Sequence, residues 1–328
     1  MTQVRENSAP DPAGLTAGRA GTVPSRRRRR YSVLTRRDKI TLSLMVGIPL
    51  VLDLIFIWGP AIASIIFSFT QWNGVHGLAA KDWVGLGEYQ KLGLPFGPNY
   101  EAFWEAVKHN LIWFLVLMFV ATPIGMFFAV LLDRQLRGGS FYQTIFYMPV
   151  VLSLAVVGLI WELQYSQDNG LLDSLLRVVH ISPVDWLGDP KINLWAALVA
   201  ASWRHVGYIM VLYLAGLKSV DPSLREAAAI DGANGVETYI HVVFWVMMPI
   251  NTVIVVVTSI EALRAFDIAW MINHGKNGLE LLGTVITNAS VSEANLIGFG
   301  SAVATVLLVV SLVPIVTFLL RITREEAQ

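Results

Sequence analysis

Six long apolar segments, separated by polar connectors, constrain this chain of 328 residues more than any other feature of its sequence. A helix crosses a bilayer with about 20 consecutive apolar residues, and each of the segments is long enough. Charged residues make up only 15% of the chain, whereas a soluble domain carries roughly 25%. We therefore expect an all-α polytopic membrane protein with six transmembrane helices. The predicted spans are Leu42–Phe69, Asn110–Leu132, Phe141–Gln164, Leu194–Leu217, Val242–Leu263 and Phe299–Leu320.

The Lys and Arg residues predict the side of the membrane on which each connector lies. With a cytoplasmic N-terminus, the inside connectors 1–41, 133–140, 218–241 and 321–328 together hold 16 of these cations. The outside connectors 70–109, 165–193 and 264–298 hold 6, leaving out Arg264 at a helix boundary. Cytoplasmic loops carry the excess of Lys and Arg, so both termini are predicted to be cytoplasmic.

The N-terminal 38 residues differ in composition from the rest of the chain. Residues 1–38 are rich in Ala, Gly, Pro, Ser and Arg and have no apolar period, so we predict a disordered basic cytoplasmic tail before a transmembrane domain over 39–328. The run Arg26–Arg30 could bind nucleic acid, but ahead of a span it is expected to be a topology signal that attracts anionic lipid. The apolar stretch after Arg36 and Arg37 is longer than a signal peptide's core of about 7–15 residues, so the first helix is expected to be retained.

The long outside connectors carry several tryptophans, among them Trp72, Trp83, Trp104 and Trp186. Trp near a membrane edge is usually an interfacial anchor, which is the default interpretation for most of them. Loops of this size could also form a surface for an external partner.

A short polar run, PSLREAAAIDGANGVETYI, separates the fourth and fifth predicted spans at residues 222–240. Ser223 can cap a helix, and Glu226 follows at the spacing of a capping box. A small apolar face follows, Gly232 interrupts it, and a second short helix is expected from Val236. We call this helix–Gly–helix unit the elbow (residues 222–240) and expect its smooth face to admit another surface closely. That face comprises Leu224, Ala227, Ala228 and Ile230. A plain re-entry turn, in which Glu226 only caps, is the alternative.

The elbow also resembles a known motif. Its Glu-Ala-Ala-x-x-Asp-Gly-Ala core is similar to the EAA motif of the membrane-spanning subunits of binding-protein-dependent ABC importers. Five further segments resemble carbohydrate-importing members of this family. They are Ser68-Phe69-Thr70-x-Trp72-Asn73-Gly74, Trp83-Val84-Gly85-Leu86-x-x-Tyr89, Trp186-Leu187-Gly188-Asp189-Pro190, Leu214-Ala215-Gly216-Leu217 and Gly298-Phe299-Gly300-Ser301-Ala302. The likeness covers about residues 42–320.

This resemblance implies a permease subunit in a bacterial cell membrane that moves a sugar or oligosaccharide. It implies a second permease subunit (a different homologous chain is favoured), two ATPase subunits and an extracytoplasmic solute-binding protein as partners. The residues implied to dock on an ATPase subunit and transmit its movement are Glu226, Ala227, Ala228, Asp231, Gly232 and Ala233. No cofactor is implied in this chain, because ATP and Mg²⁺ would be bound by the ATPase subunits.

Two places depart from the family pattern. Pro249 comes four residues later than the family's proline, and since proline kinks the preceding helical turn, we expect the kink of the fifth span about one turn further along. The outside segment 273–278 lacks the Gly-Gly-Pro pattern common there.

The sequence offers little for chemistry within this chain. There is no Cys, no G-x-x-x-x-G-K-[ST] phosphate loop and no metal-binding spacing among the six His residues, and a catalytic role is not predicted. A polytopic membrane enzyme is therefore a weak alternative. The two halves do not repeat each other, which argues against a carrier built from fused repeats, but a stand-alone secondary carrier or channel stays open.

Ionisable residues inside predicted spans are the candidates for a substrate path, since exposing them to lipid is costly. They are Asp53, Arg204, Glu261 and Arg264. In the fifth span, Thr258, Glu261 and Arg264 share one stripe; in the fourth, Arg204 and Tyr208 lie one turn apart with Trp203 alongside. Together they offer hydrogen bonds for sugar hydroxyls and an aromatic face for sugar C–H groups.

The resemblance places a transient sugar site on the same two spans. By ungapped spacing from the elbow it implies Arg204, Tyr208, Thr258, Glu261, Ala262 and Ala265. The alternative is a structural ion pair between Arg204 and Glu261, with Arg264 extending outward. For Asp53 a packing role is expected, and Asn110, Glu162 and Asn251 are expected to form helix-end or interhelical hydrogen bonds.

Overall fold

The computed structural model describes residues 35–93, 100–134, 137–167, 169–292 and 295–325, and these residues form helices and loops without a named strand. The predicted all-α class is confirmed. The chain divides into two compact units, residues 1–54 and 55–328. Much of the predicted disordered tail, residues 1–34, lies outside the described residues, and the first helix begins at Arg36 after Thr35 caps it.

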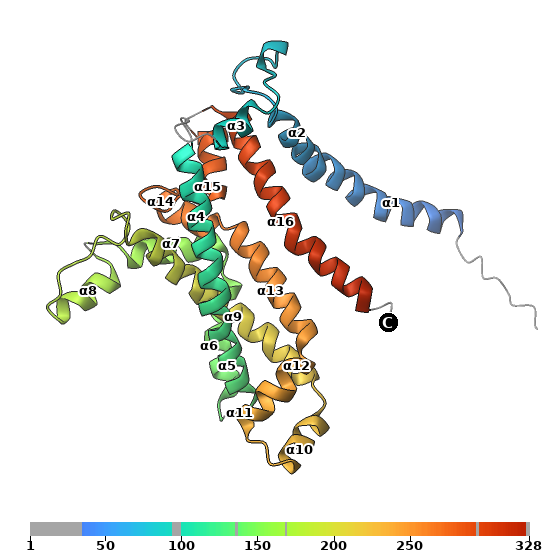
Figure 1. The fold of residues 1–328 in the computed structure, drawn as a ribbon, viewed down its shortest axis with the longest axis vertical. Coiled ribbons are helices and arrows are strands. Elements are labelled where there is room, and N and C mark those ends of the chain that lie inside the picture. The colour runs from blue at the N-terminus through green and yellow to red at the C-terminus, as the bar shows by residue number, and fades with distance from the viewer. Residues whose placement is uncertain (1–34, 94–99, 135–136, 168, 293–294, 326–328) are drawn as a thin grey trace, which may run out of the picture. The chain divides into compact units, whose positions relative to one another are not determined.

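The α-helices are α1 (Arg36–Asp53), α2 (Gly59–Phe67), α3 (Gly87–Gly93), α4 (Tyr100–Val116), α5 (Thr122–Asp133), α6 (Gly139–Val151), α7 (Leu154–Gln164), α8 (Leu171–Val178), α9 (Asn193–Ser219), α10 (Pro222–Ile230), α11 (Gly235–Thr238), α12 (Phe244–Val246), α13 (Met248–Leu263), α14 (Asp267–Asn273), α15 (Leu282–Thr287) and α16 (Ile297–Glu325) (Figure 1). Short π-helical turns join some of them: η1 (Leu54–Trp58), η3 (Leu117–Ala121), η4 (Tyr239–Val243) and η5 (Asn288–Ser292). A 3-10 turn, η2 (Ala80–Asp82), lies in the loop after α2.

Four helices are long and apolar enough to cross a membrane unbroken. They are Arg36–Phe67, Tyr100–Asp133, Asn193–Ser219 and Ile297–Phe318. Two bent pairs raise the number of candidate spans to six if each pair is one span. These four helices match the predicted first, second, fourth and sixth spans, and the two bent pairs match the predicted third and fifth spans.

The predicted third span is not a single straight helix. It consists of α6 and α7, which meet at 99°. Leu152 and Ser153 have extended backbone angles, and the Ser153 side chain accepts a hydrogen bond from Val156 N as the cap of α7. An N-cap starts a new helix, so the apolar composition hid a break that Ser153 specifies.

The predicted fifth span is bent by 76° between α12 and α13, at Met247. Pro249 lies in the first turn of α13, where its missing N–H is tolerated. The carbonyl oxygen of Phe244, at the break, accepts a hydrogen bond of 2.9 Å from Asn251 Nδ2. Pro249 therefore begins the helix that follows the bend, and Asn251 satisfies a backbone group that the break exposes. The shift of the bend by one turn relative to the family stays a prediction.

Helix α9 forms the centre of the second unit. Many of its residues are buried, and it contributes to two apolar clusters, one with α4 and α14 and one with α5 and η4. Gly125 of α5 packs against it: a Cβ there would lie 2.8 Å from the Val206 carbonyl oxygen and 2.9 Å from Ile209 Cβ. Small residues allow such close backbone approach in membrane helices.

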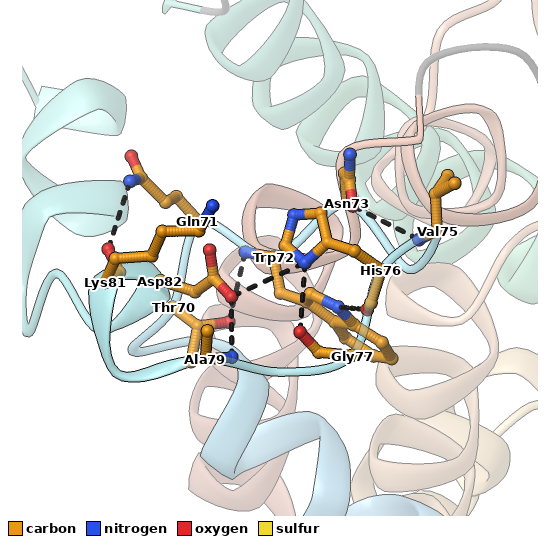
Figure 2. Close-up of polar contacts among 10 residues, drawn as sticks. All are labelled: Thr70, Gln71, Trp72, Asn73, Val75, His76, Gly77, Ala79, Lys81 and Asp82. Carbon is orange, nitrogen blue, oxygen red and sulfur yellow. Dashed lines mark hydrogen bonds and ion pairs between the residues drawn. The ribbon is translucent and has the colours of Figure 1, made fainter.

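The loop that follows α2 is held by its own polar contacts (Figure 2). Asp82, which is buried, accepts a hydrogen bond of 2.8 Å from Ala79 N and lies 3.7 Å from His76 Nδ1. The Trp72 indole N–H donates to the His76 carbonyl oxygen, and a β-bridge joins Thr70 to the residue after Asp82. Trp72 thus fastens this loop, a role beyond the anchor that its composition suggested.

Candidate functional site

The first helix of the elbow, α10, has its N-cap two residues earlier than predicted. Asp221 is the N-cap, its side chain accepts a hydrogen bond of 2.9 Å from Ser223 N, and Pro222 is the first helical residue. The predicted cap at Ser223 with a capping box to Glu226 is therefore wrong. Proline is favoured in the first turn and Asp before it, so the Asp-Pro pair was the better signal. Glu226 is exposed, and the described residues show no hydrogen bond from its side chain.

Gly232 ends α10 as predicted. Its φ is +83°, a left-handed conformation that residues with a Cβ rarely adopt. The N–H of Gly232 donates to the Ala229 carbonyl oxygen and the N–H of Ala233 donates to that of Ala228. This is the Schellman arrangement that closes a helix at a glycine.

The second elbow helix, α11, begins at Gly235, one residue before the predicted start. Asn234 caps it, accepting hydrogen bonds of 3.0 Å from Val236 N and Glu237 N. Glu237 returns a hydrogen bond to Asn234 N at 2.8 Å. Sequence reasoning missed this capping box, although its Asn-x-x-Glu spacing is the usual signal for one.

The elbow exposes most of the face predicted for it. Ile230 is 86% and Leu224 38% exposed, and Ala227 and Asp231 are also exposed. Ala228 is buried against the rest of the second unit, while Ala233 is half-buried. An exposed apolar face rimmed by charge is the pattern of an interaction surface. In Figure 1, α10 and α11 lie at one end of the second unit, and α3 and α15 lie toward the opposite end.

A cavity of about 470 Å³ lies among α9, α13 and α14. This volume is within the usual range of roughly 300–1,000 Å³ for small-molecule sites. Its polar lining consists of Arg204, Tyr208, Glu261, Arg264 and Asp267. Its aromatic lining consists of Trp113 and Phe266, and Ala265 also reaches it. Four of the predicted path residues therefore meet at one cavity.

An ion cluster stands at the wall of this cavity. Arg204 Nη1 lies 2.8 Å from Glu261 Oε1, and His205 Nδ1 lies 3.0 Å from Glu261 Oε2. The ion pair that the sequence left as an alternative is formed, and it lines the cavity at the same time. Contact of Arg204 or Glu261 with a substrate stays a prediction.

His205 is the residue of this cluster that sequence reasoning missed. Only 1% of its side chain is exposed, and its Nε2 lies 3.1 Å from Thr122 Oγ1 and 3.4 Å from Thr258 Oγ1. Each imidazole nitrogen thus has a partner. The available signal was a His next to Arg204 inside a predicted span. The spacing of His residues for metal binding does not reveal such a role.

The remaining predicted path residues lie outside the cavity lining. Trp203 is 41% exposed and packs edge-on against Trp161, with ring centroids 5.9 Å apart. Thr258 is buried behind the cluster, next to His205. Ala262 is fully buried, and its carbonyl oxygen accepts a hydrogen bond of 3.1 Å from Asn110 Nδ2.

Asn110 forms the interhelical hydrogen bonds expected of it. Besides Ala262, its Oδ1 accepts a hydrogen bond of 2.8 Å from Leu282 N. One amide side chain on α4 therefore joins the end of α13 to the start of α15. Asp53 is half-buried in the first unit. Across the described residues, no group of three or more His, Asp or Glu is placed to hold a metal ion.

Comparison with known proteins gives a consistent result. Residues 121–324 match the sequence model of the family described as binding-protein-dependent transport system inner membrane component. The chain is 30% identical over 272 residues to the xylose/arabinose import permease XacH of Haloferax volcanii, covering 81% of this chain and 83% of that protein. It is 29% identical to the arabinooligosaccharides transport permease AraP of Bacillus subtilis, covering 81% and 83%.

The fold is also found in a solved structure. A chain of the bacterial alginate ABC transporter, crystallised with an alginate pentasaccharide-bound periplasmic protein, superposes with a TM-score of 0.71. The sequence identity is 20%, and the likeness covers 86% of this chain and 93% of that one.

Proposed function

This chain belongs to the family of binding-protein-dependent transport system inner membrane components, and from that premise we propose that it moves an uncharged sugar or oligosaccharide through the cavity beside the Arg204–Glu261 cluster. Such a permease is a multi-pass inner membrane protein, and the ATPase activity lies in partner subunits. Membership of this family excludes the two alternatives, a stand-alone carrier and a membrane enzyme.

The lining of the cavity is the observation that carries the sugar proposal. Tyr208 and the ion cluster offer hydrogen-bond donors and acceptors, and Trp113 offers an aromatic face. Sugars are bound through such a combination of polar groups and apolar ring contacts. The relatives named for xylose/arabinose and arabinooligosaccharides support the same class of substrate.

The charges of the lining favour a neutral substrate. Two cations, Arg204 and Arg264, and two anions, Glu261 and Asp267, line the cavity. These charges balance, so the lining has no excess cation for a carboxylate-bearing sugar. We therefore expect this permease to differ in substrate charge from the structurally similar alginate transporter.

The elbow is proposed to couple this cavity to the ATPase subunits. Glu226, Asp231 and the exposed face with Ile230 would dock on one ATPase subunit, and a second, homologous permease chain would complete the path. Both termini and the elbow are proposed to be cytoplasmic, with the loop of Figure 2 on the side of the binding protein. The excess of Lys and Arg on the elbow side supports this orientation.

Reconstitution tests the proposal. The full complex, with the second permease, the ATPase subunits and the binding protein, is placed in liposomes and given labelled xylose, an arabinooligosaccharide or an alginate oligosaccharide. We expect ATP-dependent uptake of a neutral sugar and loss of that uptake in Glu226→Ala at unchanged protein level. Uptake only of the acidic sugar, or uptake without ATPase subunits, would refute the proposal.

A further inference from the structure

Arg225, in the first helix of the elbow, contacts the ends of two other helices of the second unit. Its Nη1 donates a hydrogen bond of 2.6 Å to Asp133 Oδ2, and its Nη2 donates one of 3.2 Å to the Leu217 carbonyl oxygen. Asp133 is the last residue of α5, and Leu217 lies in the last turn of α9. One guanidinium group therefore joins α10 to both α5 and α9.

The chemistry of this contact suits arginine. The planar guanidinium presents several donors in a fixed fork, whereas an ammonium is a single point charge. The carbonyl groups at the C-terminus of α9 carry the negative end of the helix dipole, so both acceptors attract the same cation. The side chain of Asp133 is 16% exposed and that of Arg225 36% exposed, which places the pair between a solvated and a buried one.

Helices α5 and α9 form a closely packed pair beyond this contact. Gly125 brings α5 against the α9 backbone at Val206, as described above. At the cavity end of α5, Thr122 Oγ1 lies 3.1 Å from His205 Nε2, and His205 in turn contacts Glu261. One helix, α5, thus reaches the elbow through its last residue and the ion cluster through its first.

We propose that Arg225 is a positioning residue that makes the α5–α9 pair follow the elbow, so that movement of the elbow reaches the ion cluster at the cavity. The role in transport rests on the proposed function, in which the ATPase subunits move the elbow. The contact of Arg225 with Asp133 and Leu217 does not depend on that function. Arg225 precedes the motif residues that the resemblance implied, beginning at Glu226, and it acts through Asp133 and Leu217, not through a partner subunit.

The first test measures sugar molecules taken up per ATP hydrolysed by the reconstituted complex. Arg225→Gln is expected to lower this ratio by about three- to tenfold, the usual scale for residues along a coupling network, while the ATPase subunits still co-purify. The exchanged pair Arg225→Glu with Asp133→Arg is expected to recover at least half of the ratio. Arg225→Lys keeps the charge and is expected to be intermediate. Lys218→Gln is the matched control, since Lys218 is an exposed cation near the same end of α9 with no ion pair to the described residues.

The second test measures the contact without any transport. The chain has no cysteine, so spin labels can be attached singly at Ile230→Cys on α10 and Phe127→Cys on α5, both exposed positions. We expect a narrow distance distribution in the parent protein, a broad one with Arg225→Gln, and a narrow one again in the exchanged pair.

The two tests separate the two proposals. An unchanged uptake ratio or an unchanged distance distribution in Arg225→Gln overturns the role of Arg225, as does an exchanged pair that recovers neither. A parent complex that takes up no sugar overturns the proposed function instead, and the distance measurement still decides whether Arg225 holds the elbow to α5.

Discussion

Replacing Gly232 tests whether the shape of the elbow matters for docking an ATPase subunit. Gly232 has a φ of +83°, and a Cβ built on it would meet no atom within 4 Å. An added side chain therefore meets open space, and the penalty comes from the backbone alone. In Gly232→Ala we expect helices α10 and α11 to stay folded while the turn between them leaves the left-handed conformation, which docking would then have to restore.

The size of the effect follows from the cost of a left-handed conformation, about 1–2 kcal/mol for a residue with a Cβ. If docking requires this turn, that free energy is lost from the complex. A change of about 1.4 kcal/mol alters a dissociation constant tenfold, so binding of the ATPase subunit should weaken about 5- to 30-fold in Gly232→Ala. Asn tolerates this conformation better, so Gly232→Asn should bind more tightly than Gly232→Ala.

The assay is the dissociation constant of the labelled ATPase subunit for the detergent-solubilised permease complex. Gly235→Ala is the matched control, because Gly235 has no positive φ and a Cβ there would meet only Arg134 Nη2, at an ordinary 3.6 Å. It should bind as the parent does. Equal affinity of Gly232→Ala and the parent, or equal weakening in Gly235→Ala, would refute the reasoning.

Three further predictions follow from the bundle and the elbow cap. Glu261→Gln leaves the guanidinium of Arg204 without its counter-charge, so the free energy of unfolding should fall by about 1–3 kcal/mol and the thermal unfolding midpoint in detergent should fall with it. An unchanged midpoint would contradict a stabilising ion cluster. Gly125→Ala forces α5 and α9 apart at a cost of about 1–3 kcal/mol, whereas Gly47→Ala, with open space around it, should leave the same midpoint unchanged. The hydrogen bonds from the backbone N–H and side chain of Ser223 hold the pKa of Asp221 below its ordinary value. The cap is therefore complete above the ordinary carboxyl pKa and is lost as the pH falls through the folded-state value. Hydrogen exchange at α10 should report this pH dependence, and Asp221→Ala should abolish the pH dependence.

Hydropathy and the positions of Gly and Pro predicted the features of the fold that depend on local sequence. Long apolar runs give spanning helices whatever their neighbours, so α9 was predicted to within two residues at each end. Gly232 was predicted to end α10 because a left-handed helix end selects glycine by local sterics. Pro249 predicted the bend before α13 for a similar local reason.

Tertiary arrangement limited the remaining predictions. The bend between α6 and α7 depends on a capping Ser153 inside an apolar run, and hydropathy averages over such a residue. The role of His205 depends on Thr122 of another helix, 83 positions away in the chain. The role of Arg225 depends on Asp133, 92 positions away in the chain. The Ser153 cap is a local signal within the run, whereas the contacts of His205 and Arg225 join distant segments, and no spacing within one segment encodes those two.

The break at Met247 has a mechanical consequence. The helix leaving the elbow bends by 76° before it reaches the cavity, so a force along the axis of α12 is not aligned with α13. Helix α9 enters the elbow from the other side as one unbroken rod of 27 residues, about 40 Å long at 1.5 Å per residue. A force applied at the elbow should therefore be transmitted more directly along α9 than along the bent helix that follows the elbow.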